Sequence, residues 1–393
     1  MKAQPTARSI LKRLLIDILL TGIALVIFAL FHHVLPRQMT SIGTVIENPY
    51  KRPAETENSS FLQLPDDSML LAASGTTGDV LFSDGTVLSA SSGKSRPGSS
   101  QQNRSRQNSG GNSKGGSALD ETSTEAEDSA DAEDSTPIWE KFEDRFTDEI
   151  IITDTSYTSP DISITVSEET LQNGRITYYL ADIYLRDVTC FQSVLAGDTY
   201  GKGFRDSIPD MATLSNALIA INGDYYGNTS EGVVIRNGVI YRANPTNCDV
   251  CVLYYDGSMR VMPGSAFSVE DAIAQGAWQA WTFGPALLDT DGNVLTDFDS
   301  TGRIIAANPR TAIGYYEKGH YCMVVVDGRG DSAGITLPDL SQLFYDLGCT
   351  AAYNLDGGNS SVMVWQQDVV NQPSGGGRES SDALLITEVT QYE

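Results

Sequence analysis

The 393-residue chain has few histidines, few basic residues and an odd number of cysteines. Three histidines are present, and His32 and His33 adjoin an apolar N-terminal run, so only His320 remains for the rest of the chain. A single histidine argues against Ser-His or Cys-His catalysis and against a histidine-ligated zinc site. Five cysteines exclude a disulfide framework that pairs all of them.

Basic side chains are outnumbered, with 26 Lys and Arg against 51 Asp and Glu, for a net charge of −25. Residues 150–393 carry 12 basic and 30 acidic side chains, a net charge of −18, whereas residues 1–40 have a net charge of +4. Affinity for nucleic acid comes from clustered Lys and Arg. This composition therefore excludes nucleic acid as an expected partner.

One long apolar run lies near the N-terminus, at residues 14–35, and Asp17 is its only charged residue at neutral pH. The basic side chains before it are Lys2, Arg8, Lys12 and Arg13. A helix needs about 20 apolar residues to cross the hydrocarbon layer, and basic flanks stay on the cytoplasmic side. We predict a single-pass anchor at 14–35, a cytoplasmic segment at 1–13 and an extracytoplasmic C-terminal domain. A cleaved signal peptide is the alternative, and it too would export the chain.

Residues 36–137 are predicted to be a largely disordered, low-complexity linker. Aromatic residues are absent between Phe82 and Trp139, and the chain there is rich in Ser, Gly, Gln and Asn, then in Asp and Glu. Such a composition cannot bury enough apolar area to offset the entropy of ordering. As a flexible tether, about 47 residues would span ~40 Å. Residues 79–88 read as a hairpin, to which we assign no role.

From about residue 150 to the C-terminus, alternating apolar residues, aromatics and turn signals predict one globular domain of 150–393. Strand signals outnumber helix signals there. We therefore expect an α+β or α/β fold with mixed β-sheets.

Three short apolar runs in this domain are each followed by an aspartate and a glycine. The runs are 217–221, 321–326 and 350–355, and the aspartates that follow them are Asp224, Asp327 and Asp356. Continuous apolar runs of this length predict buried strands. The sequence therefore places three carboxylates near strand ends.

Two arguments from topology bring these groups together. The amphipathic run 336–347 predicts a helix between the second and third strands, and strands joined by such a crossover should be parallel. Asp327 and Asp356 would then lie at the same sheet edge, where ligands bind in open α/β sheets. Residues 311–316 and 321–326 predict a hairpin with a four-residue loop, which would place Arg310 opposite Asp327.

The loop after the third strand, 356–361, contains two glycines and two serines. Consecutive N–H groups in a glycine-rich turn bind anions, and serine hydroxyls add donors. We predict that Gly357, Gly358, Ser360 and Ser361 form such a cradle. The plainer interpretation is a tight turn in which the aspartate acts as a local cap.

Several segments resemble the phosphodiester glycosidase family, which is also called the NAGPA-like or uncovering-enzyme-like family. The matching segments are INGDYYG at 221–227, FGPALL at 283–288, NPRTAIG at 308–314, VDGR at 326–329 with GITL at 334–337, NLDGGNSS at 354–361, and NQPS at 371–374 followed by Arg378 and ALLI at 383–386. Two departures are Asp224-Tyr225-Tyr226, where many members have Gly and two Phe, and Asn359, where Gly is commoner.

The resemblance implies an N-acetylglucosamine-1-phosphodiester α-N-acetylglucosaminidase-like hydrolase that cleaves a sugar from a phosphodiester at its anomeric carbon. Together with the anchor, it suggests a cell-surface polysaccharide or its precursor as the substrate. Two alternatives are a non-catalytic glycan-binding or assembly module for exopolysaccharide, and a phosphodiesterase that cuts the P–O bond.

This chemistry assigns roles to the candidate residues. Phosphate departs readily once its charge is stabilised, and the planar fork of arginine suits this task. Arg310 is the first candidate and Arg329 the second, and Asn222 and Arg378 complete the predicted binding residues. A carboxylate from Asp224, Asp327 or Asp356 would stabilise the oxocarbenium-like centre, attack it or deprotonate water. We expect no required cofactor, and Ca²⁺ or Mg²⁺ as an optional ligand.

Three other signals are read as structural. Residues 289–293 look like the start of a calcium loop, but the glycine is misplaced, which favours a turn. Cys248 and Cys251 have redox spacing without a following helix to activate a thiolate. Trp278 and Trp281 are predicted to pack in the core rather than on a sugar.

Overall fold

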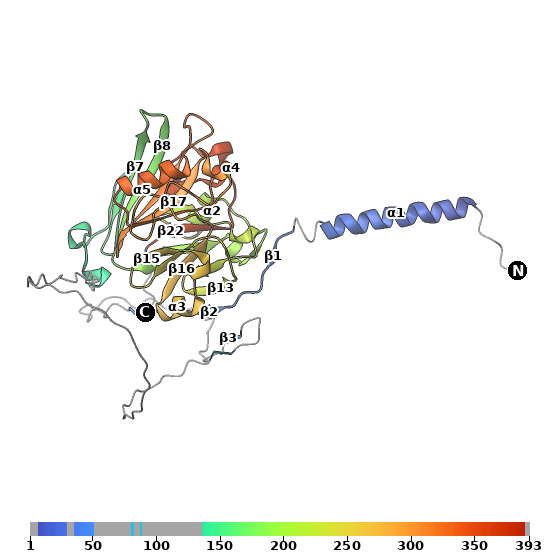
Figure 1. Cartoon of the computed structure of the whole chain (residues 1–393), viewed down its shortest axis with the longest axis horizontal. Helices are drawn as coiled ribbons and strands as arrows, with labels where there is room; N and C mark the ends of the chain where they lie inside the picture. Colours follow the sequence, from blue (N-terminus) through green and yellow to red (C-terminus); the bar gives the residue numbers. More distant parts are fainter. Residues whose placement is uncertain (1–6, 30–34, 51–79, 82–86, 89–135, 390–393) are drawn as a thin grey trace, which may run out of the picture. The chain divides into compact units, whose positions relative to one another are not determined.

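The computed structural model of the chain describes residues 7–29, 35–50, 80–81, 87–88 and 136–389 (Figure 1). The chain divides into two compact units, of which one combines residues 1–55 with 136–393 and the other is 56–135. In the second unit, β3 (Val80–Leu81) pairs antiparallel with β4 (Val87–Leu88). This pairing confirms the hairpin predicted at 79–88.

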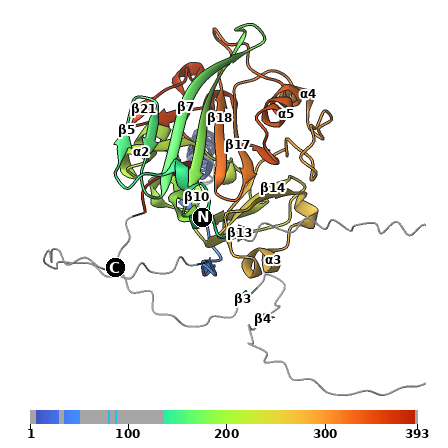
Figure 2. The same cartoon turned by 90° about the vertical axis from the view of Figure 1, so that its left-hand side faces the viewer.

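The largest sheet of the first unit has seven strands in the order β19-β17-β18-β8-β7-β6-β5 (Figure 2). Its strands are β5 (Ile151–Ile152), β6 (Ser156–Thr158), β7 (Ile162–Leu171), β8 (Ile176–Leu185), β17 (Arg310–Glu317), β18 (His320–Val326) and β19 (Ala351–Asn354). Alternating burial along β7 follows the period-two pattern of its sequence, because one face packs on the core.

Two further sheets complete the core of the domain. The six-stranded sheet, in spatial order, contains β15 (Met259–Met262), β14 (Val250–Tyr254), β16 (Ala277–Thr282), β12 (Val233–Arg236), β13 (Val239–Ala243) and β2 (Thr44–Val45). The five-stranded sheet contains β21 (Asp368–Val369), β20 (Met363–Trp365), β11 (Ile219–Asn222), β22 (Asp382–Ile386) and β9 (Phe191–Leu195). A small pair joins β1 (Arg37–Gln38) to β10 (Gly201–Lys202).

Every pairing between the described strands is antiparallel. The domain is thus mainly β, and the α/β alternative with parallel neighbours is wrong. Its α-helices are α2 (Ile208–Leu214), α3 (Val269–Ala274), α4 (Gly302–Ile305) and α5 (Leu337–Asp346). Hairpins and short loops join most strands, and such connections cannot produce parallel neighbours.

The helix predicted at 336–347 is α5, which begins after the N-cap Thr336, whose hydroxyl accepts the Asp339 N–H. The crossover therefore exists, but β17 lies between β18 and β19 and pairs antiparallel with both. The two outer strands run in the same direction without being neighbours. Their carboxyl ends still lie at one edge of the sheet.

The predicted hairpin is β17 and β18, with a register that differs from the expected one. Arg310 pairs with Val326, not with Asp327, because the register shifts between Tyr315 and Glu317. A bulge inserts one extra residue on one strand and displaces all later pairs. The sequence argument, which paired residues symmetrically about the loop, could not include it.

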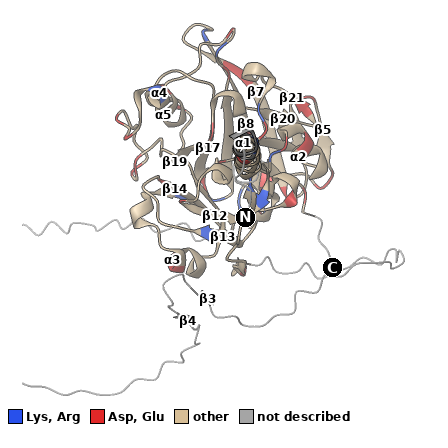
Figure 3. Ribbon diagram, turned by 90° about the vertical axis from the view of Figure 1, so that its right-hand side faces the viewer, with Lys and Arg blue, Asp and Glu red and all other residues tan. Residues whose placement is uncertain are grey.

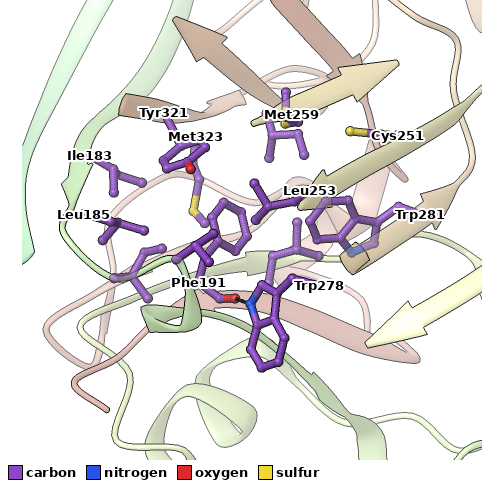
Figure 4. Packing of buried hydrophobic residues seen from close by; sticks show 14 of the residues in the cluster. Ile183, Leu185, Phe191, Cys251, Leu253, Met259, Trp278, Trp281, Tyr321 and Met323 are labelled. Carbon is purple, nitrogen blue, oxygen red and sulfur yellow. Dashed lines mark hydrogen bonds between the residues drawn. The ribbon is translucent and has the colours of Figure 1, made fainter. Parts of the chain in front are cut away.

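The hydrophobic core confirms the structural interpretation of both tryptophans (Figure 4). Trp278 and Trp281 are buried on β16, and the Trp278 indole donates to the Phe191 carbonyl over 2.6 Å. The core also contains Ile138, which precedes the predicted domain start at 150. A residue before position 150 therefore contributes to the core of the domain.

The helix α1 (Ala7–Ala29) overlaps the apolar run that we interpreted as an anchor. Within the described parts of the chain, no helix meets the length and apolarity needed to cross a membrane. The predicted anchor of 14–35 includes residues 30–34, which lie outside the described residues, as does most of the predicted linker. The described strands β1 and β2 fall within the predicted linker of 36–137, yet both pair with strands of the domain.

Candidate active site

The centre of the candidate site is the glycine-rich loop 356–361, which follows β19. One Asp356 carboxylate oxygen accepts the Gly357 N–H over 3.0 Å, and the other accepts the Ser360 hydroxyl over 2.8 Å. The Arg378 guanidinium donates to the second oxygen over 2.6 Å and also to Ser360. The side chains of Asp356 and Arg378 are 13% and 43% exposed. A carboxylate and a guanidinium thus meet where solvent has access.

The backbone of the loop does not form the open cradle that we predicted. Gly357 donates to the Asp356 side chain, Gly358 to the Pro309 carbonyl, and Ser360 and Ser361 to carbonyls within the turn. These N–H groups are therefore already used in holding the turn together. Gly358 has φ +70°, a conformation that glycine adopts without strain. The turn interpretation, with Asp356 as a local cap, describes this geometry.

Arg329 approaches the same loop from the end of β18. It adopts a left-handed conformation with φ +63°, and it donates to the side-chain oxygens of Asn359 and Asn308, over 2.9 Å in each case. A Cβ on Gly358 would lie 3.2 Å from the Arg329 guanidinium. Glycine at 358 therefore lets this exposed guanidinium lie against the loop.

Asn222, at the end of β11, links the five-stranded sheet to the loop. Its amide donates to the Asp356 carbonyl over 2.7 Å, and its oxygen accepts the Thr311 hydroxyl of β17 over 2.7 Å. The side chain is fully buried. Its position makes Asn222 a connector between β11, β17 and β19, with no face toward solvent.

Asp224 belongs to a buried ion cluster with Arg236 of β12 and Asp382 of β22. The Arg236 Nη2 lies 2.9 Å from Asp224 Oδ2 and 2.8 Å from Asp382 Oδ2, and its Nε donates to Asp382. Asp224 also accepts the N–H groups of Tyr226 and Thr282, each over 3.0 Å. All three charged side chains are buried, so the cluster is shielded from solvent.

The two carboxylates of this cluster differ in their bonding. The second oxygen of Asp382, Oδ1, has no partner among the described residues, and it faces Gly223, where a Cβ would approach it to 2.3 Å. Burial raises the pKa of Asp382 to about 8, despite the opposing attraction of Arg236. A proton on Asp382 would remove one of the two negative charges that face Arg236.

Asp327 anchors the loop that follows β21. Its carboxylate accepts the Asn371 amide over 2.8 Å and the Gln372 N–H over 3.0 Å, and Asn371 also donates to the Ser361 carbonyl. Asp327 is therefore joined to loop 356–361 through one asparagine. Burial raises the pKa of Asp327, although these bonds oppose the shift.

Arg310 is buried and points its guanidinium at backbone carbonyls. It donates to Ile304 and Ala306 at the end of α4, and more weakly to Ile335. Burial, together with repulsion from Arg329, lowers the pKa of Arg310 to about 10. None of its described bonds is to a carboxylate, so the expected pairing with Asp327 is not formed.

The structure thus leaves Asp356, Arg329 and Arg378 at least partly accessible and buries most of the other candidates, Ser360 among them. Sequence reasoning missed Arg236 and Asp382. Asp382 begins β22, whereas the pattern we used required an aspartate after a strand. In an antiparallel sheet the start of one strand lies beside the end of its neighbour, and Asn222 indeed pairs with Ala383.

Acidic residues occur in many separate segments of the domain (Figure 3). Among the described residues, no group of three or more His, Cys, Asp or Glu side chains is arranged to hold a metal ion. Asp289, in the predicted turn, accepts the N–H groups of Asp291 and Asn293, and Leu288 pairs with Val294. These bonds confirm the turn interpretation of 289–293.

Residues 215–387 match the family model of phosphodiester glycosidases, NAGPA. The match confirms the resemblance that the sequence motifs carry. The match contains β11, β17, β18, β19 and β22, together with every candidate site residue.

Among curated proteins, the chain is 31% identical over 196 residues to the SPbeta prophage-derived uncharacterized protein YomE of Bacillus subtilis. The alignment covers 48% of this chain and only 30% of YomE.

Solved structures that match part of the chain include the zebrafish N-acetylglucosamine-1-phosphodiester alpha-N-acetylglucosaminidase catalytic domain, auto-inhibited by pro-peptide. It is 21% identical, with a TM-score of 0.47 and coverage of 58% of this chain and 83% of that one. A hypothetical protein from Synechocystis is 13% identical, with a TM-score of 0.45 and coverage of 58% and 62%.

Proposed function

We propose that this protein hydrolyses a glycosyl phosphodiester at the bond between the anomeric carbon and the phosphate oxygen. The observation that carries the proposal is the partly exposed Asp356 carboxylate, held by Ser360 and Arg378 within the glycine-rich loop of a phosphodiester glycosidase domain. A carboxylate and a nearby cation are the two groups that this reaction needs. Water supplies the hydroxyl group of the released sugar, and phosphate departs with the bonding electrons.

Two arginines support the binding of the phosphate group. Arg378 and Arg329 contact adjacent residues of the loop, Ser360 and Asn359 respectively. Charge-assisted bonds from a guanidinium to phosphate oxygens are stronger than neutral hydrogen bonds. Both are exposed in a domain of net charge −18, so they supply the local positive charge that an anionic substrate requires. They replace Arg310, which is buried and whose Nε and Nη2 donate to backbone carbonyls.

Asp356 is the carboxylate that we assign to the reacting centre. The Asp356 side chain remains 13% exposed beside Arg378. Asp224 and Asp327, in contrast, are buried and form hydrogen bonds that hold neighbouring loops. Positive charge develops at the anomeric carbon in the transition state, and a fixed carboxylate stabilises it. Asp224 and Asp327 are accordingly positioning residues in this proposal.

We also propose that the domain acts outside the cytoplasm on a cell-surface polysaccharide or its precursor, with residues 14–35 as a membrane anchor. The support is in the sequence. Four basic residues precede an apolar run, which predicts an exported C-terminal part. Divalent cations remain an optional ligand in this proposal, and the assay below should be run with and without Mg²⁺, Ca²⁺ and a chelator.

The test is incubation of the full-length protein with an N-acetylglucosamine-1-phosphodiester in oxygen-18 water. Label in the released sugar is expected, because water attacks carbon. Label in phosphate would overturn the proposal in favour of P–O cleavage. Binding without turnover would instead favour a glycan-binding or assembly module. Asp368→Asn, an exposed carboxylate on β21, is the matched control for Asp356→Asn.

A further inference from the structure

Residues 36–50, here called the N-terminal strap, precede the serine-rich stretch and yet are built into the domain (Figure 1). Within the strap, β1 pairs with β10 and β2 pairs with β13. Without the strap, β13 would be an open edge of the six-stranded sheet. The strap therefore fills a position that the domain leaves for a strand.

Backbone hydrogen bonds fix the strap along its length. The Met39 N–H donates to the Tyr200 carbonyl over 3.1 Å, the Gly43 N–H to Ile240 over 2.8 Å, and the Ile46 N–H to Gly238 over 2.7 Å. In the other direction, the Tyr255 hydroxyl donates to the Ile46 carbonyl over 3.3 Å. These bonds extend over both attachment points.

Two neighbouring side chains of the strap differ sharply in burial. Ile46 is 3% exposed and belongs to the main hydrophobic core, whereas Val45 is 67% exposed. Met39 packs against the cluster that contains Tyr200 and Tyr226. The strap thus inserts apolar side chains into the domain in addition to its strand pairing.

The domain has glycines where the strap approaches most closely. A Cβ on Gly201 would lie 2.5 Å from the Arg37 carbonyl oxygen, and one on Gly276 would lie 2.9 Å from Pro49. On Gly203 it would lie 3.2 Å from Pro36. Two separate segments of the domain, 201–203 and the turn at Gly276, therefore make room for the strap.

We propose that the strap is an internal ligand of the domain, bound tightly enough to hold the domain to the N-terminal helix without the covalent connection through 51–135. The serine-rich and acidic stretch is then an insertion whose two ends both belong to the domain, and not the tether. Cutting the chain within that stretch would leave a two-piece complex.

This arrangement shortens the connection between α1 and the domain. Only residues 30–36 separate α1 from β1, and seven residues span at most about 25 Å when fully extended. The tether that we predicted from sequence would have allowed ~40 Å. If α1 is an anchor, the domain remains close to the membrane surface whether or not the insertion is cut.

The experiment uses the full-length chain with an N-terminal affinity tag and a site for a sequence-specific protease in place of residues 101–107. After cleavage, verified on a denaturing gel, the C-terminal piece should remain on the tag resin. Ile46→Asp should reduce the retained fraction ~10-fold or more, because a buried carboxylate without a partner weakens the contact. Val45→Asp, on the exposed neighbour, should leave retention unchanged.

Release of the C-terminal piece from the cleaved wild-type protein would overturn the proposal, and so would equal retention of the Ile46→Asp and Val45→Asp proteins. Near-ultraviolet circular dichroism of the uncut variants checks that each domain is folded. If Ile46→Asp is not folded, Ile46→Ala replaces it, and it should lower retention relative to Val45→Ala. The readout is independent of hydrolytic activity.

Discussion

Two arginine–aspartate sites lie in this domain, and they differ in their access to water. Arg236 contacts Asp224 and Asp382 with all three side chains buried, whereas Arg378 contacts Asp356 with the Arg378 side chain 43% exposed. The first arginine also donates to the carbonyls of Ile235 and Ala280, so its donors are committed to the fold. Arg378 can give up a bond to Asp356 or Ser360 and bind a ligand instead without disturbing the hydrophobic core.

The comparison shows that the same residue types, arginine and aspartate, can stabilise the fold at one site and remain available for a reaction at another. Removing one partner of a buried ion cluster leaves a charge that the interior cannot solvate. Removing one partner of an exposed pair allows water to replace it. The buried cluster therefore supports the ends of β11, β12 and β22, and the exposed pair is free to meet a substrate.

The largest expected effect is on stability, from Arg236→Met. This change leaves the buried Asp224 carboxylate without a cation and should lower the free energy of unfolding by about 3–5 kcal/mol. Arg378→Met should lower it by less than about 1 kcal/mol. Urea denaturation followed by tryptophan fluorescence measures both. Equal losses in the two variants would contradict the division between the sites.

Next in size is the effect of Asp356→Asn on turnover. Loss of one electrostatic stabiliser at the reacting centre typically lowers turnover ~100-fold or more. The substitution keeps the size of the side chain, so urea denaturation should show little change in stability. The Asp368→Asn control should retain wild-type turnover of the same phosphodiester. Normal turnover by Asp356→Asn would remove this residue from the reacting centre.

A smaller effect is expected in the pH dependence of stability. The pKa of Asp382 is raised to about 8 in the folded protein by burial and is near 4 when unfolded. Between these values the folded state holds a proton that the unfolded state has lost, so this residue makes stability fall as pH rises, by at most about 1.4 kcal/mol per pH unit.

Asp382→Asn should flatten this part of the curve, because asparagine does not titrate. Urea midpoints measured from pH 4.5 to pH 8.5 would reveal the difference between wild type and variant. A wild-type curve that rises with pH by the same amount as the variant curve would show that Asp382 does not hold a proton in the folded state.

Local patterns in the sequence predicted most of the individual elements. The apolar face of 336–347 indicated α5, and the apolar runs at 217–221, 321–326 and 350–355 correspond closely to β11, β18 and β19. The pairing of strands that are distant in the sequence was harder to predict. That β17 lies between β18 and β19 depends on the packing of whole sheets, which no local pattern contains.

The sequence predicted which loops form the site, but not which of their residues are exposed and which are buried. Asp327 is joined to loop 356–361 through Asn371, and Asn222, two residues before Asp224, donates to the same loop. Their exposure could not be derived, because the partners that bury them come from distant strands, as Arg236 does for Asp224. Arg310 illustrates the same limit, since a bulge and the carbonyls of α4 decide where its guanidinium lies.

The smallest expected effect distinguishes the two exposed arginines from each other. Arg329 donates to Asn359 of the loop and to Asn308, which precedes β17, whereas Arg378 contacts the proposed catalytic carboxylate itself. Arg329→Ala should therefore raise the KM for the phosphodiester by about ten-fold or less, the scale of one charge-assisted hydrogen bond, and change kcat little. Arg260→Ala, an exposed arginine bonded to Gln275, should leave both constants unchanged. A loss confined to kcat would instead place Arg329 in contact with charge that develops only in the transition state.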